Sequence, residues 1–222
     1  MIAAVALYFM PSSTATTLAW PSPGRFALAV IVAFTLTLIA AWAGGRALIE
    51  ALLPITRVLL GWLDDRFGIL FLGVEHNWQD TVIRLHVSLT QFLVIGGQAV
   101  PPTPKGLMWV TTPIGDLLQP LVIAAGLAAA WPGSLTTRLL RLGIALTLGL
   151  LFLIVNVPLT LYAVIWDMLT YQLGSDGFSP LLAWYQFMQS GGRLGVGVLL
   201  ALLATGIESG VSKEIIMRQT RS

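Results

Sequence analysis

The chain contains no cysteine, and this absence removes several kinds of chemistry at once. Disulfides, thiolate nucleophiles and cysteine-held zinc or iron–sulfur centres are all excluded. The two histidines, His76 and His86, lie near Glu75 and Asp80, so one interpretation of this group is a zinc site. Structural zinc sites usually need four good ligands, so a turn residue and a strand residue are the favoured roles. We therefore expect no metal, no catalytic residue and no cofactor.

Charge is also scarce, because Asp, Glu, Lys and Arg together make up 10% of the 222 residues. A soluble domain carries about 25%, so most of this chain cannot face water. With 56% hydrophobic residues, the composition predicts a multi-pass membrane protein that has the lipid bilayer as its first partner. The net charge of +2 comes from scattered basic residues, so no nucleic-acid partner is expected.

Long apolar segments predict a mainly α-helical fold with about four transmembrane helices. The predicted spans cover residues 26–45, 107–131, 142–166 and 191–207. The predicted order is a leader at 1–25, the first span, an amphipathic helix with a β module at 46–106, and a bundle of the other spans at 107–222. Within the bundle we expect a periplasmic loop at 167–190 and a cytoplasmic tail at the end of the chain.

The segment between the first two spans changes its pattern. Residues 46–63 have apolar side chains on one side, which is typical of a helix in the membrane interface. Residues 69–75 are apolar and residues 81–89 alternate between polar and apolar, with a turn at 76–80 between them. This pattern predicts a small β-hairpin, which needs another element to pack against because an isolated hairpin is marginally stable.

Basic residues indicate which side of the membrane each loop occupies. Lys and Arg near the ends of spans mark the cytoplasmic side. One side of the four-span arrangement collects Arg25, Arg138, Arg141, Lys213, Arg218 and Arg221. We therefore expect both termini in the cytoplasm and the β-hairpin outside it. For a bacterial inner (cytoplasmic) membrane, the hairpin would face the periplasm.

Three of the polar residues inside predicted spans are candidates for a functional role, because polar groups are costly there. Asp116 and Arg193 lie just inside the outer ends of their spans, and they neutralise each other if the two helices are neighbours. Asn156 precedes Pro158, which frees a backbone carbonyl that the Asn156 side chain can satisfy. For the charged residues, a structural ion pair and a substrate or proton position are both open. For Asn156, a simple kink and an ion or substrate site are both open.

Two further surfaces are candidates for contact with other proteins. Glycines at GxxxG spacing give the last span a small-residue face that suits helix association. These glycines are Gly191, Gly195, Gly206 and Gly210. The candidate partner surface on the hairpin consists of Glu75, His76, Trp78 and Arg84.

The order of these features resembles the exosortase H-associated membrane proteins. The residues that carry the resemblance are Pro23, Gly24, Arg25 and Phe26 at the first span, Val74 and Glu75 at the end of the β segment, and Gly191, Gly192 and Arg193 before the last span. The resemblance implies an accessory subunit beside a membrane-embedded sorting transpeptidase. Exosortases use Cys, Arg and His, so a chain without cysteine cannot be the enzyme of such a pair.

The favoured hypothesis is a non-catalytic accessory or scaffold subunit of an inner-membrane complex, with other integral membrane proteins as partners. The alternative is a small transporter or channel subunit that works through Asp116, Asn156 and Arg193. An intramembrane hydrolase ranks last, because Ser88 and His86 lack an evident third group to orient them.

Overall fold

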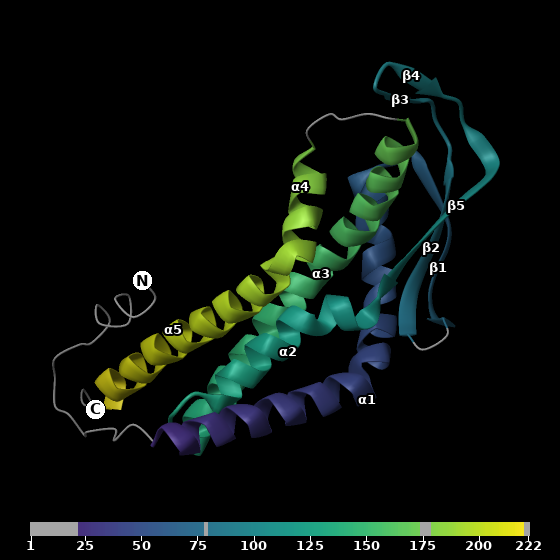
Figure 1. The fold of residues 1–222 in the computed structure, drawn as a ribbon. Helices are drawn as coiled ribbons and strands as arrows, with labels where there is room; N and C mark the ends of the chain where they lie inside the picture. The colour runs from purple at the N-terminus through teal and green to yellow at the C-terminus, as the bar shows by residue number, and fades with distance from the viewer. Residues whose placement is uncertain (1–21, 78–79, 174–178, 220–222) are drawn as a thin grey trace.

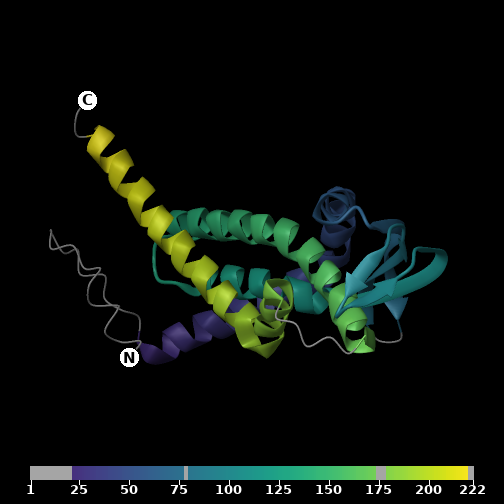
Figure 2. The same cartoon turned by 90° about the horizontal axis from the view of Figure 1, so that it is seen from above.

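A computed structural model describes residues 22–77, 80–173 and 179–219. It is mostly helical, with three long apolar helices that have the length and composition to cross a membrane. The predicted leader at 1–25 lies almost wholly outside the described residues, and so does Trp78. A β-sheet occupies one end of the molecule, and the helices run away from it (Figures 1 and 2).

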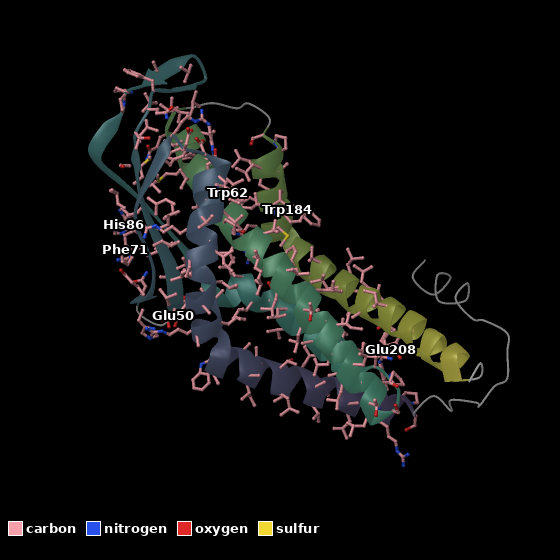
Figure 3. The ribbon with its side chains drawn as sticks, turned by 180° about the vertical axis from the view of Figure 1, so that it is seen from behind. Glu50, Trp62, Phe71, His86, Trp184 and Glu208 are labelled. Atoms are coloured by element: carbon pink, nitrogen blue, oxygen red, sulfur yellow. The ribbon has the colours of Figure 1, made fainter. Side chains whose placement is uncertain are left out.

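Helix α1 (Pro23–Leu63) joins the predicted first span and the predicted interfacial helix into one bent helix of 41 residues. The predicted span ends at residue 45, directly before the charged residues Arg46 and Glu50. In the structure they form an ion pair of 2.8 Å between Arg46 Nε and Glu50 Oε1, one helical turn apart. The bend of α1 lies on the N-terminal side of Glu50 (Figures 1 and 3), so it precedes Pro54 in the chain.

The predicted hairpin exists, and a third strand extends it into a sheet. Strands β1 (Phe67–Asn77), β2 (Asp80–Leu89) and β5 (Thr103–Pro113) form an antiparallel sheet in the order β1-β2-β5. A separate hairpin of β3 (Leu93–Ile95) and β4 (Gln98–Val100) turns at Gly96 and Gly97. Their φ values of 58° and 81° are the left-handed values that a tight hairpin turn requires.

The second predicted span starts later than expected. We predicted a helix over residues 107–131, but β5 continues to Pro113, and helix α2 (Ile114–Ala130) has 17 residues. The reason is the β-branched run Val110, Thr111 and Thr112, which favours a strand although its hydropathy also suits a helix. Hydropathy alone does not separate the two structures in a short apolar segment.

The remaining helices also extend beyond their predicted ends. Helix α3 (Leu135–Leu173) includes the third predicted span and continues through the start of the predicted loop at 167–190. Most of the other described residues of that loop form helix α4 (Pro180–Phe187) and the π-turn η2 (Met188–Gly192). Helix α5 (Arg193–Gln219) follows, after a kink at Gly191, whose φ is 107°.

The main hydrophobic core lies between the sheet and the helices. On β2, Ile83, Leu85, Val87 and Leu89 are buried on one face, as strand alternation requires. They belong to one cluster with Ile49, Leu52 and Leu60 of α1 and with residues of α2 and α3. Part of the apolar face predicted to lie on the membrane interface is therefore covered by protein, whereas Ile55 remains 44% exposed.

Candidate functional site

The outer face of the sheet carries a row of aromatic rings. Strand pairing sets Phe71 of β1 and Trp109 of β5 on either side of His86 of β2. The Phe71 and His86 ring centroids are 5.3 Å apart, and both side chains lie on the face that turns away from the helices (Figure 3). Phe71 remains 40% exposed and Trp109 remains 59% exposed. This row, which we call the aromatic row, is an exposed and largely apolar surface.

An ion pair lies beside the aromatic row. Arg84 of β2 is opposite Gly73 of β1, and Arg84 Nη1 is 2.6 Å from Glu75 Oε2. The Arg84 guanidinium also lies 5.8 Å from the centre of the Trp109 ring, within the range of a cation–π contact. The phenyl ring of Phe71 folds over Gly73, where an added Cβ would lie 2.6 Å from Phe71 Cζ. The glycine therefore lets the ring lie flat along the sheet.

The structure divides the predicted partner surface between two faces. Glu75 and Arg84 lie beside the aromatic row. His76 follows Glu75 on the same strand, so its side chain points to the opposite face, where it lines a cleft. Its Nδ1 lies 3.2 Å from Thr81 Oγ1. The alternative interpretation of this group as a zinc site gains no support, because the described residues contain no group of three His, Asp or Glu side chains that could hold a metal ion.

The cleft lies between α1, the first turns of α2, the tip of the β1–β2 hairpin and the start of α5. Its volume is about 940 Å³, and its lining is mainly apolar with a few polar groups. This combination is typical of small-molecule sites. Polar side chains that line it are Arg46, His76, Asp80, Thr81, Asp116 and Gln119.

The two predicted intramembrane charges meet at this cleft. Arg193 Nη1 lies 2.9 Å from Asp116 Oδ2, so the start of α5 is paired with the first turn of α2. The Arg193 side chain is 9% exposed, whereas that of Asp116 is 45% exposed and lines the cleft. The pair ties two helices together and still presents a carboxylate to the cleft.

Asn156 lies elsewhere, in the interior of α3. It is buried, and its Oδ1 has no hydrogen-bond partner among the described residues. We predicted that this side chain can satisfy the carbonyl freed by Pro158. An acceptor oxygen cannot do so, which leaves the amide group as the available donor.

The glycines of the predicted packing face are open among the residues that the structure describes. An added Cβ at Gly191, Gly195, Gly206 or Gly210 would meet nothing within 4 Å. Close helix packing involves another glycine of α5, Gly197, where a Cβ would lie 2.7 Å from Cβ of Ile123 in α2. The GxxxG spacing therefore does not mark the contact between α2 and α5.

Two polar clusters were not predicted from the sequence. Asp64, just after α1, binds Arg66 through Nε at 2.8 Å and Nη2 at 2.6 Å. The hydroxyl of Tyr162 in α3 donates to Asp64 Oδ2 at 2.5 Å, and the Arg66 guanidinium lies 5.8 Å from the centre of the Trp166 ring. This cluster fastens the end of α1 to α3.

Burial alone would raise the pKa of the Asp64 carboxyl. The hydrogen bonds from Arg66 and Tyr162 outweigh burial and hold that pKa below its ordinary value of 3.8. The hydrogen bond to Asp64 is the main cause that raises the pKa of Arg66, so this pair stays charged at neutral pH.

The second cluster is a buried ion pair between α3 and α5. Arg141 Nη2 lies 3.2 Å from Glu208 Oε2, and the two side chains are 4% and 8% exposed. The sequence placed Arg141 on the cytoplasmic side but indicated no partner for it. The separation of Arg141 and Glu208 by 67 positions concealed the contact.

Comparisons of this chain with protein-family models, with curated proteins and with solved structures each found no match.

Proposed function

We propose that this chain is a non-catalytic subunit of a membrane complex, and that its helices hold the sheet at the membrane surface for a partner protein. The observation that carries the proposal is the exposed aromatic row beside the Arg84–Glu75 pair. Aromatic residues and arginine are the types that dominate binding energy in protein interfaces. The composition supports the membrane part of the proposal, because three long apolar helices fit a bilayer.

The proposed arrangement has four apolar segments that cross the membrane, with α2 as the shortest. The start of α1, the connection from α2 to α3 and the end of α5 gather at the end of the molecule opposite the sheet (Figure 1). Arg25 and Arg138 belong to that end, which supports a cytoplasmic location for it and for both termini. The sheet is then extracytoplasmic. The resemblance described above favours an exosortase-type sorting system in a bacterial inner membrane as the complex.

The absence of cysteine permits a direct test of sidedness. Single cysteines are introduced at Phe92, between β2 and β3, and at Ser134, between α2 and α3. Intact cells are then treated with a membrane-impermeant maleimide. We expect labelling at position 92 before lysis and at position 134 only after lysis. The reverse pattern would contradict the proposed orientation.

Partner binding is tested by affinity purification of the full chain in mild detergent. We expect an integral membrane protein to be recovered in stoichiometric amount with the wild type and to be lost with Trp109→Ala. Removing an interface hot spot costs about 2 kcal/mol or more, which is about thirtyfold in affinity. The matched control is Trp62→Ala, because Trp62 is 81% exposed on α1, away from the aromatic row. Equal recovery with both variants would contradict the proposed docking surface.

The alternative is a small transporter or channel subunit. The specific observation in its favour is the Asp116–Arg193 pair, which presents a half-exposed carboxylate to a cleft beside apolar helices. A flux assay in vesicles with Asp116→Ala, Asn156→Ala and Arg193→Ala tests this function. Unchanged flux in all three would exclude it.

A further inference from the structure

The cleft between α1 and α2 has its polar residues at one end. Along α1 the lining changes from Phe34, Leu38 and Trp42 to Arg46, which is nearest the bend. Along α2 the order is reversed: the polar Asp116 and Gln119 come first, and the apolar Val122 and Ile123 follow. The polar ends of both helices coincide with the tip of the β1–β2 hairpin, which adds His76 and Asp80. The cleft is therefore amphipathic along its length.

The apolar end of the cleft is continuous with the surface that faces outward from the helices. Leu38, Ile39, Trp42 and Leu194 line the cleft and are each more than half exposed. In a membrane these side chains contact hydrocarbon, so an acyl chain can enter sideways from the bilayer. The polar end lies beside the sheet, and the arrangement proposed above puts the sheet at the membrane surface, so this end would lie at the level of the lipid headgroups. This geometry selects a ligand with an apolar chain and a polar head.

The charges at the polar end include both signs. Arg46 is exposed, and its ion pair with Glu50 is exposed as well. Because exposed pairs contribute little, Arg46 can exchange Glu50 for a phosphate at small cost. Asp80 and Asp116 present carboxylates to the same cleft. Together they complement a headgroup that carries a phosphate and a primary ammonium group.

We propose that this cleft binds a zwitterionic aminophospholipid, with its phosphate at Arg46, its ammonium group at Asp80 and Asp116, and an acyl chain along Leu38 and Trp42. The proposal goes beyond the docking function of the aromatic row and does not depend on it. A bound lipid would fill the angle between α1 and α2 and would help to fix the sheet relative to the bilayer.

The test uses the full chain in nanodiscs that contain equal parts of phosphatidylethanolamine, phosphatidylcholine and phosphatidylglycerol. Native mass spectrometry after release measures the lipid retained on each chain. We expect one phosphatidylethanolamine per chain, because phosphatidylcholine lacks N–H donors and phosphatidylglycerol lacks an ammonium group. Preferential retention of either other lipid, or of none, would overturn the proposal.

Variants identify the site without disturbing the Asp116–Arg193 pair. An added Cβ at Gly115 meets nothing within 4 Å, and Gly115 lines the cleft, so Gly115→Trp fills the cleft with little strain. Gly143 on α3 is equally open and lies outside the cleft, so Gly143→Trp is its matched control. We expect at least about tenfold weaker retention for the first variant and unchanged retention for the second. Equal retention in both would overturn the proposal.

Two charge variants test the headgroup contacts separately. Arg46→Gln should weaken retention about tenfold, whereas Arg57→Gln, at an exposed position of α1 outside the cleft, should not. Asp80→Asn should reduce the preference for phosphatidylethanolamine over phosphatidylcholine, whereas Asp65→Asn should leave it unchanged. If the lipid preference does not respond to Asp80→Asn, the ammonium contact is wrong.

Discussion

On the inner face of the sheet the large apolar side chains are buried, whereas in the helical bundle many of them lie outside. Ile83 and Leu85 of β2 are fully buried, but Leu28 and Leu36 of α1 are each more than 60% exposed. The sheet end is thus packed like a soluble protein, in which burial of apolar area drives folding. The bundle end suits lipid, which is as apolar as leucine and therefore does not drive such side chains inward.

Small residues take the inner positions of the bundle. A second buried cluster consists of Ala128, Ala145 and Ala204, one each from α2, α3 and α5. Small side chains let helix backbones approach closely, which is the main source of stability when the solvent is hydrocarbon. One chain thus packs in two ways, with large apolar side chains buried behind the sheet and small residues inside the bundle. Helices α1 and α3 extend from the first region into the second.

The largest expected effect comes from the buried ion pair of the bundle. Glu208→Gln leaves the Arg141 charge buried without its carboxylate, and this should lower the free energy of unfolding by about 3–5 kcal/mol. Denaturant unfolding of the purified protein in mild detergent measures the change. Glu50→Gln is the control, because its pair with Arg46 is exposed and should contribute no more than about 1 kcal/mol. Equal losses would contradict the special role of the buried pair.

The core behind the sheet should respond almost as strongly. Leu85→Ala removes a fully buried side chain and should cost about 2–5 kcal/mol, because it leaves a cavity. Leu151→Ala on the exposed face of α3 should change the free energy by no more than about 0.5 kcal/mol. Thermal unfolding in detergent compares the two. A larger loss for Leu151 would reverse the proposed contrast between the two ends.

The Asp64 cluster predicts a dependence on pH. Because the folded-state pKa of Asp64 is below 3.8, its stabilising effect is complete above that value and disappears as the pH falls through the lower folded value. At neutral pH, Asp64→Asn should cost about 1.5–3 kcal/mol, typical of hydrogen bonds to a charged group. Unfolding of wild type and variant between pH 7 and pH 3 should show this difference shrink below about pH 4.

Asp65→Asn is the matched control for that experiment, because Asp65 is the exposed neighbour of Asp64. We expect it to change the free energy of unfolding by no more than about 0.5 kcal/mol at neutral pH. If the difference in free energy of unfolding between wild type and Asp64→Asn grows as the pH falls, the pKa of Asp64 is not lowered in the folded protein.

The smallest expected effect tests the small-residue packing. Ala204→Leu inserts a larger side chain into the closed alanine cluster and should cost about 1–3 kcal/mol. Ala40→Leu, at an exposed position of α1, should be neutral within about 0.5 kcal/mol. Thermal unfolding measures both. Tolerance of leucine at position 204 would contradict close packing among α2, α3 and α5.

The sequence predicted the helices and strands whose patterns extend over a few neighbouring residues. The alternation over residues 81–89 predicted β2, and the apolar segments predicted the long helices of the bundle. The charge at Arg46 and Glu50 misled the prediction of a helix end, because two charges one turn apart can pair and continue a helix. Strand β5 was missed because its residues are apolar enough for a span and most of its paired partners on β2 lie more than twenty positions away.

The candidate site, too, was predicted only in part from the sequence. The sequence identified Asp116 and Arg193 as costly charges, and the structure pairs them across 77 positions. It had no signal for the aromatic row, because Phe71, His86 and Trp109 meet only through the register of three strands. The Asp64–Tyr162 hydrogen bond was likewise invisible, since nothing local to either residue indicates the other.

The sequence by itself determined that the chain is mainly apolar and helical, that it cannot use cysteine chemistry, and that a β segment interrupts its apolar helices. These properties follow from composition and from periodicities over a few residues. Only the tertiary structure decided which strand completes the sheet, which charges neutralise each other and where a cleft opens between α1 and α2. The reason is that strand register, helix packing and buried ion pairs join residues distant in the chain, and their free energy exists only once those residues are in contact.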